Sequence, residues 1–183
     1  MCNETDIRLW QKLNHVSCRD LPAAVSAFDD LKHPSVITHL RKRWPPDLVA
    51  AAITLTIARR KAAKKFVDPE HLFADPIGVE QATGIEVARY KARRFAEIGV
   101  DRIIDLCCGI GGDAMALAGI ADMMLIDTDP GRAWMARHNV ETAGGRRPAV
   151  AVADVTTLRI SDTPFHIDPE RRTVHGRRRH GFE

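Results

Sequence analysis

The most constraining feature of this sequence is a short apolar run that passes through an acid into a glycine turn. Residues 103–113 read Ile-Ile-Asp-Leu-Cys-Cys-Gly-Ile-Gly-Gly-Asp. The apolar residues predict a buried strand, and the closely spaced glycines let the backbone approach a ligand. The amides of such a turn, with the positive end of the helix that starts near Asp113, donate hydrogen bonds to a nucleotide-like cofactor. The segment therefore predicts an α/β sheet with a cofactor site.

The acid before the turn, Asp105, separates two classes of cofactor. A carboxylate there is unfavourable beside a pyrophosphate but favourable beside the ammonium and sulfonium of S-adenosylmethionine. It also needs a partner, because an acid inside an apolar strand end is costly to bury. The glycines alone do not decide, since residues 109–114 also satisfy the permissive G-x-G-x-x-A form of the dinucleotide fingerprint.

Two further acids close the next two apolar runs. The run at 123–126 ends in Asp127, which is placed to take the hydroxyls of an adenosine ribose. The run at 149–153 ends in Asp154, which is placed to receive the adenine amino group. Both cofactor classes use the ribose acid, whereas the third acid favours the methyl donor over a nicotinamide or flavin. Purely structural roles stay open, because Asp127 can cap a turn and Asp154 can simply end a strand.

Two segments carry helix-start signals. Asp129 precedes Pro130 and a helical pattern, which predicts an N-cap with proline at the first helical position. Residues 83–86 read Thr-Gly-Ile-Glu, which predicts a capping box in which Thr83 and Glu86 each satisfy a free amide.

Four stretches together resemble class I S-adenosylmethionine-dependent methyltransferases. Within that family they are most similar to the bacterial group with a THUMP-like domain and to RNA methyltransferases of the trimethylguanosine synthase type. The stretches are residues 81–88, 105–112, 126–130 and 168–172. The resemblance implies that the turn holds the methionine end of the cofactor and that the Thr83 segment closes over it. The cofactor-binding residues it implies are Thr83, Asp105, Cys107, Gly109, Gly111, Gly112, Asp127 and Asp154.

The catalytic loop is expected where a fourth strand ends, at Asp168 and Pro169. Amino-methylating enzymes of this family place an acid, asparagine or serine there, followed by two prolines and an aromatic residue. A carboxylate and a neighbouring carbonyl orient the attacking nitrogen by accepting its hydrogen bonds. Here Glu170 and Arg171 replace the second proline and the aromatic. Arg171 and Arg172 are candidates for binding phosphate or stacking on a base, and a turn with a solvated basic tail is the other reading.

The charge and the cysteine content limit which partners and which cellular compartment the sequence favours. The 27 basic residues are largely offset by 24 acidic ones, so the net charge of +3 favours anionic partners only weakly. Clusters at 41–43, 59–65, 93–94 and 171–179 suggest an RNA partner, although basic residues near helix ends also complement the helix dipole. The four cysteines and the histidines show no disulfide or metal spacing, which predicts a cytoplasmic protein with no metal. No apolar stretch approaches the ~20 residues of a membrane span.

The chain is expected to divide at 67–78, where Asp-Pro pairs and a glycine interrupt the helical pattern. Helical spacing is found near 5–16, 21–31, 35–43 and 46–66. The expected domains are a helical N-terminal domain at 1–78, a Rossmann-like S-adenosylmethionine-binding domain at 79–170 and a basic tail at 171–183. The fold class is α/β, a partial doubly wound methyltransferase sheet.

The expected function is methyl transfer from S-adenosylmethionine to RNA, at an amino group of a base. The alternatives are a non-catalytic nucleic-acid-binding or regulatory module with the cofactor fold, and a nicotinamide-dependent oxidoreductase. A methyltransferase sheet of this family has seven strands, and four are recognisable here, so a fragment of a longer protein is expected. An open sheet edge also predicts self-association as a homo-oligomer.

Overall fold

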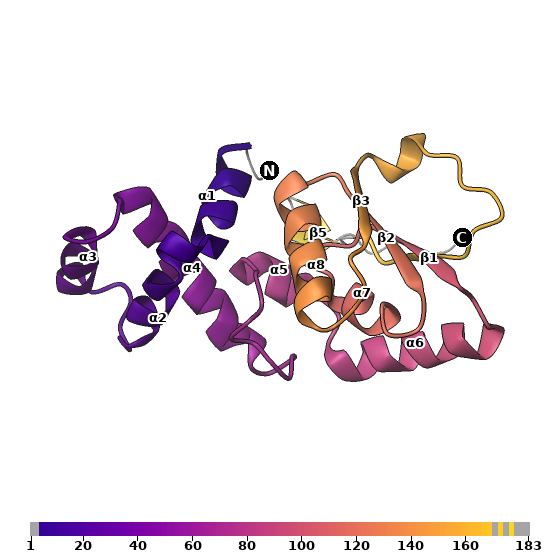
Figure 1. Ribbon diagram of the computed structural model, residues 1–183, viewed down its shortest axis with the longest axis horizontal. Coiled ribbons are helices and arrows are strands. Elements are labelled where there is room, and N and C mark those ends of the chain that lie inside the picture. Colours follow the sequence, from indigo (N-terminus) through magenta and orange to yellow (C-terminus); the bar gives the residue numbers. More distant parts are fainter. Residues whose placement is uncertain (1–3, 170–171, 174–175, 178–183) are drawn as a thin grey trace.

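The computed structural model describes residues 4–169, 172–173 and 176–177. Helices form one half of the molecule, and a sheet with its covering helices forms the other (Figure 1). The first half contains α1 (Glu4–Asn14), α2 (Asp20–Ser26), α3 (Pro34–Arg41) and α4 (Pro46–Ala62), with the short 3-10 helix η1 (Val16–Cys18). The helices expected from apolar spacing are thus present, but two are shorter than expected: α2 ends at Ser26 rather than near Leu31, and α4 ends at Ala62 rather than Phe66.

The segment expected to interrupt the helical pattern contains a helix of its own, α5 (Pro76–Gln81). Asp75 caps it, because its Oδ1 accepts the amides of Ile77 and Gly78 at 2.9 and 2.8 Å. Pro76 occupies the first helical turn, where it loses no hydrogen bond. The Asp-Pro pair therefore begins a helix where the sequence reading took it only as a break.

Basic residues at the end of α4 bind backbone carbonyls of neighbouring segments. The guanidinium of Arg60 donates to the carbonyls of Phe28 and Asp29, just beyond α2. The ammonium of Lys65 donates to three carbonyls at the end of α5, those of Val79, Glu80 and Ala82. These contacts complement the helix dipoles, so a structural role accounts for much of this basic cluster.

The main sheet is parallel and four-stranded, in the order β3-β2-β1-β4. Its strands are β1 (Arg102–Leu106), β2 (Asp122–Asp127), β3 (Ala149–Val152) and β4 (Phe165–Ile167). A separate antiparallel pair consists of β5 (Arg172–Thr173) and β6 (Gly176–Arg177). Parallel strands bring their carboxyl ends to one edge, so Asp105 near the end of β1, Asp127 at the end of β2 and Asp168 just after β4 converge there. The predicted α/β fold class is confirmed.

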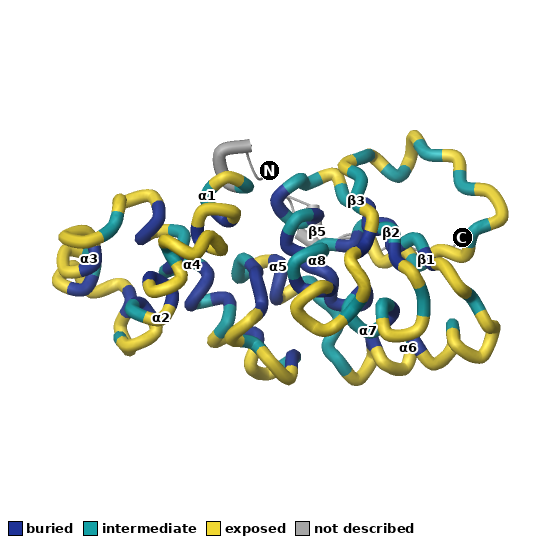
Figure 2. The backbone as a smooth tube through the Cα atoms, in the orientation of Figure 1, coloured by how far each residue is buried: buried dark blue, intermediate teal, exposed yellow. Residues whose placement is uncertain are grey.

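Three helices cover one face of the sheet: α6 (Ile85–Ile98), α7 (Gly112–Leu117) and α8 (Pro130–Thr142). Their small buried residues pack on Ile103, Met123 and Leu125 of the central strands. Figure 2 shows α6 as largely exposed, with buried positions only on its inner side. On the edge strand β4, Phe165 and Ile167 are 50% and 46% exposed. Self-association through this edge stays a prediction.

The two halves share one core. Ile110 of the glycine turn and Met135 of α8, both 1% exposed, belong to the same cluster as the buried residues of α4. Asn139 of α8 reinforces the contact, because its side-chain amide exchanges two hydrogen bonds with the backbone of Phe73 and donates a third to the carbonyl of Ile110. The domain boundaries at residues 78 and 170 stay predictions.

Within the described part of the chain, no helix is both long and apolar enough to cross a membrane. A group of possible metal ligands, which the sequence spacing did not indicate, lies at the surface in the connection between α4 and α5. It consists of Asp68, Glu70 and His71, all exposed, and His71 is paired with Asp68 at 2.8 Å. Exposed groups of this kind are common without an ion, and we assign this one no role.

Candidate cofactor site

A cavity of about 380 Å³ opens where the carboxyl ends of β1, β2 and β4 meet. Most of the residues proposed from the sequence line it: Thr83, Asp105, Cys107, Gly109, Gly112, Asp127, Asp168 and Pro169. They come from four separate stretches of chain, and the topology of the sheet brings them together. The same wall contains Asp113 and His166, which the sequence reading did not select.

The glycine turn follows β1 directly and is built from left-handed backbone conformations. Cys107, Gly109 and Gly111 have φ angles of 61°, 55° and 83°. Gly111 does not line the cavity; a Cβ on it would lie 3.0 Å from the Cα of Ala136 in α8. A Cβ on Gly112 would likewise lie 3.0 Å from the carbonyl oxygen of Thr83. Two glycines therefore seat the turn against its neighbours, while Gly109 faces open space.

Asp127 fastens the turn to the end of β2. Its Oδ2 accepts the amide of Gly109 at 2.8 Å and its Oδ1 accepts the amide of Asp129 at 2.9 Å. Asp129 is the N-cap of α8, as predicted, and accepts the amides of Gly131 and Arg132. Each carboxylate oxygen of Asp127 keeps a further lone pair for a ligand hydroxyl.

The capping box predicted at Thr83 and Glu86 is wrong. The N-cap of α6 is Gly84, with no side-chain hydrogen bond, and Glu86 is exposed. The hydroxyl of Thr83 instead donates to Oδ2 of Asp113 at 2.8 Å. A charged acceptor makes the stronger hydrogen bond, and the packing of Gly112 on Thr83 brings the hydroxyl to it.

Lys91 of α6 joins the turn to the proposed catalytic loop. Its ammonium lies 2.9 Å from Oδ2 of Asp113, 3.3 Å from Oδ2 of Asp168 and 3.4 Å from the hydroxyl of Thr83. Burial lowers the pKa of Lys91, but its hydrogen bonds and ion pairs with the two acids outweigh burial and raise it. The lysine is therefore charged and holds Asp168 at the cavity.

Asp105 is 2% exposed, and its partner is His166 of β4. The register pairs the two residues, and Nδ1 of His166 lies 2.9 Å from Oδ1 of Asp105. Nε2 of the same ring lies 3.7 Å from Oδ2 of Asp113. Burial raises the pKa of Asp105. Burial alone lowers the pKa of His166, but Asp105 and Asp113 raise it overall. The pair thus retains its proton to a higher pH than a free imidazole does.

Three further residues proposed from the sequence are not seen to line the cavity: Asp154, Arg171 and Arg172. Asp154 is exposed and caps the 3-10 helix η2 (Val155–Thr157) by accepting the amide and hydroxyl of Thr156, which lowers its pKa. Its neighbour Val155 lines the cavity. Arg171 lies outside the described residues, and Arg172 is described only as backbone of β5.

The cysteines of the turn are protonated thiols. Burial is the main cause that raises the pKa of Cys107, and the surrounding carboxylates add to it. Burial likewise raises the pKa of Cys108, strongly. A thiolate nucleophile is therefore disfavoured at both positions.

The chain is similar in sequence and in fold to proteins named as methyltransferases. No family model matches the chain. Two curated proteins, from two strains of Mycobacterium tuberculosis, are 38% identical to it over 136 residues, which is 69% of this chain. Both are named uncharacterized S-adenosylmethionine-dependent methyltransferases. The matched region spans 36% of their length, so the chain corresponds to about a third of each relative.

A solved structure of a Porphyromonas gingivalis protein assigned to the methyltransferases superposes with a TM-score of 0.55. It is 21% identical, and the match covers 73% of this chain and 35% of that one. The chain has a methyltransferase fold. In a class I methyltransferase sheet, the cavity at the carboxyl ends of the strands is where a cofactor binds, as the general rule for open α/β sheets requires.

The charges that line the cavity fit a cationic methyl donor. Asp105, Asp113, Asp127 and Asp168 all line the cavity. The arginine that lines it, Arg132, is engaged by Gln81 and Asp75, and Lys91 beside it is paired with two of the acids. A pyrophosphate would meet carboxylates there, whereas an ammonium and a sulfonium are attracted by them. Asp127 would take the ribose, and the turn from Cys107 to Gly112 would hold the methionine end.

The Asp105–His166 pair predicts a pH-dependent stability. The pKa of His166 is raised in the folded protein, so its contribution is fully present below the unfolded value of about 6.5 and is lost as the pH rises through the folded value. We expect the free energy of unfolding to fall with pH above about 6.5, and His166→Gln to flatten this part of the curve. Denaturation with urea across that range measures the slope, and equal slopes in both proteins would contradict the pairing.

Proposed function

We propose that the protein is an S-adenosylmethionine-dependent methyltransferase that methylates an amino nitrogen, with RNA as its substrate. The main support for this proposal is the cavity, because the glycine turn, Asp127 and the Asp168-Pro169 loop meet in it at one edge of a sheet with the methyltransferase fold. The names of the relatives agree with the cofactor.

The roles of the chain's own residues follow from their positions. When bound, S-adenosylmethionine supplies a methyl group on a sulfonium, and the bond to sulfur breaks with its electron pair as nitrogen attacks. Asp168, 42% exposed at its side chain, would accept a hydrogen bond from the attacking amine and direct its lone pair toward the methyl group. The backbone carbonyl before Pro169 is a second acceptor. Lys91 holds the carboxylate at the cavity, and Asp168 or solvent takes the proton that nitrogen loses.

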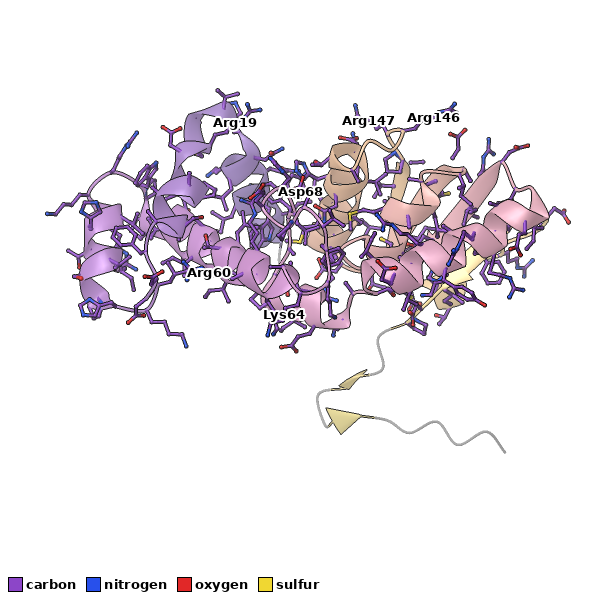
Figure 3. All side chains as sticks on the ribbon, turned by 90° about the horizontal axis from the view of Figure 1, so that it is seen from below. Arg19, Arg60, Lys64, Asp68, Arg146 and Arg147 are labelled. Atoms are coloured by element: carbon purple, nitrogen blue, oxygen red, sulfur yellow. The ribbon has the colours of Figure 1, made fainter. Side chains whose placement is uncertain are left out.

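The RNA substrate rests on the resemblance to the trimethylguanosine synthase type and on exposed basic residues. These are spread over the surface: Arg60 on α4 and Lys64 just beyond its end lie on one side, and Arg146 and Arg147 before β3 lie on the other (Figure 3). Arg60 is engaged by backbone carbonyls. Arg146 and Arg147 are ion-paired with Asp122 and Glu141. Arg93 on α6, the helix that also carries Lys91, is exposed and is the candidate for contact with a phosphate backbone.

Calorimetric titration tests the cofactor class. We expect S-adenosylhomocysteine, the product of methyl transfer, to bind and NAD not to bind. Binding of NAD with no response to S-adenosylhomocysteine would overturn the proposal in favour of an oxidoreductase.

Transfer of labelled methyl from S-adenosylmethionine to bulk cellular RNA tests the reaction and its substrate. We expect Asp168→Ala to lower the rate at least about tenfold while S-adenosylhomocysteine binding is kept, because orientation of the amine is lost and the cofactor contacts are not. Equal labelling by both proteins would remove Asp168 from the acceptor site. Labelling of protein instead of RNA would support the methyltransferase activity but contradict RNA as the substrate.

A further inference from the structure

A second cavity, a groove of about 670 Å³, lies among the helices that cover the sheet. It is lined by α6, by α7 and by the end of α8, and α7 lies between the other two helices (Figure 1). The connection after α4, from Phe66 to Leu72, closes it beside the amino end of α6, where the amide of Ile85 donates to the carbonyl of Lys65. Among the described residues, none lines both this groove and the cofactor cavity. The groove is therefore a separate site.

The groove stays open because small side chains line it on three helices. Alanines at 92 and 96 of α6, 116 of α7 and 143 at the end of α8 leave the space between the helices unfilled. The larger lining side chains are mainly apolar: Phe66, Leu72, Ile85, Met115 and Ile120. A concave site of this volume, with apolar walls and few polar groups, is the usual form of a small-molecule site.

The groove is elongated. Ile85, Arg89, Ala92 and Ala96 line it and share one face of α6, at the spacing of successive helical turns. At a rise of about 1.5 Å per residue, the stretch from Ile85 to Ala96 is roughly 16 Å long. An extended apolar chain matches this shape better than a compact ring system does.

One charged group of the lining has no partner. The other polar side chains that matter here are engaged: Asn139 by the backbone of Phe73 and Ile110, Thr142 by His138, Asp68 by His71 and Arg89 by Glu86. Arg93 makes no hydrogen bond or ion pair within the described part of the chain. Glu97, one turn further along α6, is paired with Arg94 instead. The guanidinium of Arg93 is therefore free to meet an anion at the edge of the groove.

We propose that this groove binds an aliphatic carboxylate, with the hydrocarbon chain along the apolar walls and the carboxylate on Arg93. A planar guanidinium matches a carboxylate by two parallel hydrogen bonds. Burial of the chain supplies most of the affinity, and the ion pair selects the charge of the head group. A polyanion such as RNA would meet Arg93 but would leave the apolar walls exposed. The inference goes beyond the proposed function and does not depend on it.

Calorimetry with three ligands of equal chain length tests the class of ligand on the chain itself. We expect octanoate to bind more tightly than octanol, and octanol more tightly than octylammonium, because only the carboxylate pairs with Arg93. Decanoate should bind roughly tenfold more tightly than octanoate, since it buries two more methylene groups. Equal affinities for octanoate and octylammonium, or no gain with chain length, would overturn the proposal.

Two exposed positions of α6 locate the site without disturbing the core. Arg93→Gln should weaken octanoate about three- to fivefold and leave octanol unchanged, as loss of an exposed ion pair predicts. Arg94→Gln is the matched control, because it removes the same charge from the same helix outside the groove. Ala96→Phe puts a ring into the groove from an exposed position, so it should abolish binding of octanoate and octanol alike.

S-Adenosylhomocysteine affinity, measured on the same variants, separates this inference from the proposed function. It should be unchanged in all three, because none of these residues lines the cofactor cavity. Octanoate that binds Ala96→Phe as tightly as the wild type would show that the groove is not its site. An unchanged octanoate affinity in Arg93→Gln would assign that guanidinium to another anion. Failure of the wild type to bind S-adenosylhomocysteine would contradict only the proposed function.

Discussion

Gly111→Ala is expected to destabilise the protein by about 2–5 kcal/mol, a large part of the 5–15 kcal/mol of an ordinary domain. Two causes add. The φ of 83° is left-handed, which costs an L-residue about 1–2 kcal/mol. The new Cβ would also lie 3.0 Å from the Cα and 3.2 Å from the carbonyl oxygen of Ala136, and overpacking of this kind costs about 1–3 kcal/mol.

Gly144→Ala separates these two causes. Gly144 has a φ of 86°, but nothing lies within 4 Å of a Cβ built on it, so only the backbone strain applies. Urea denaturation of both variants measures the difference, which is the contribution of the close contact between the turn and α8. Equal losses in the two variants would show that the turn is not seated against Ala136.

Asp127→Ala is expected to weaken binding of S-adenosylhomocysteine by roughly a hundredfold or more. The variant removes a carboxylate that would accept two ribose hydroxyls, and each charge-assisted hydrogen bond contributes about 1.5–3 kcal/mol. It also releases the amide of Gly109, so the turn loses its tie to β2. Calorimetry measures the affinity, and urea denaturation measures the accompanying loss of stability.

Asp129→Ala is the matched control for this prediction. Asp129 also accepts two backbone amides, those of Gly131 and Arg132, but they belong to the first turn of α8. Removal of an N-cap costs about 0.5–2 kcal/mol, so stability should fall while ligand affinity is kept. If both variants lost affinity equally, the effect of Asp127 would come from backbone disorder rather than from contact with the ribose.

The sheet was predictable from the sequence because each strand is a short apolar run that ends in a polar signal. The runs before Asp127, Asp154 and Asp168 correspond to β2, β3 and β4, and parallel topology alone places the ends of β2 and β4 beside the glycine turn. The helix starts were predictable only in part. At Asp129 the local pattern decided the outcome, whereas at Thr83 a more distant carboxylate, Asp113, captured the hydroxyl.

The charged centre of the site could not be read from the sequence, because its contacts join distant segments. Lys91 stands in a basic helical stretch that resembles a solvated surface, and His166 stands between two apolar residues of a strand. One signal for Lys91 was available: it is three residues after Ala88 and adjacent to Ala92, the buried positions of α6, so it faces inward. The pairing of His166 with Asp105 needs the register of β4 on β1, which no local pattern specifies.

The shared core links ligand binding to regions of the molecule that no ligand touches. Because Ile110 and Met135 pack among the helices of the first half, opening of those helices also removes the support of the glycine turn. A ligand that binds only the intact turn therefore stabilises α4 by mass action. Substitutions in the buried core of the helical half will consequently alter cofactor affinity without altering a single cofactor contact. The first half thus supports the conformation of the site.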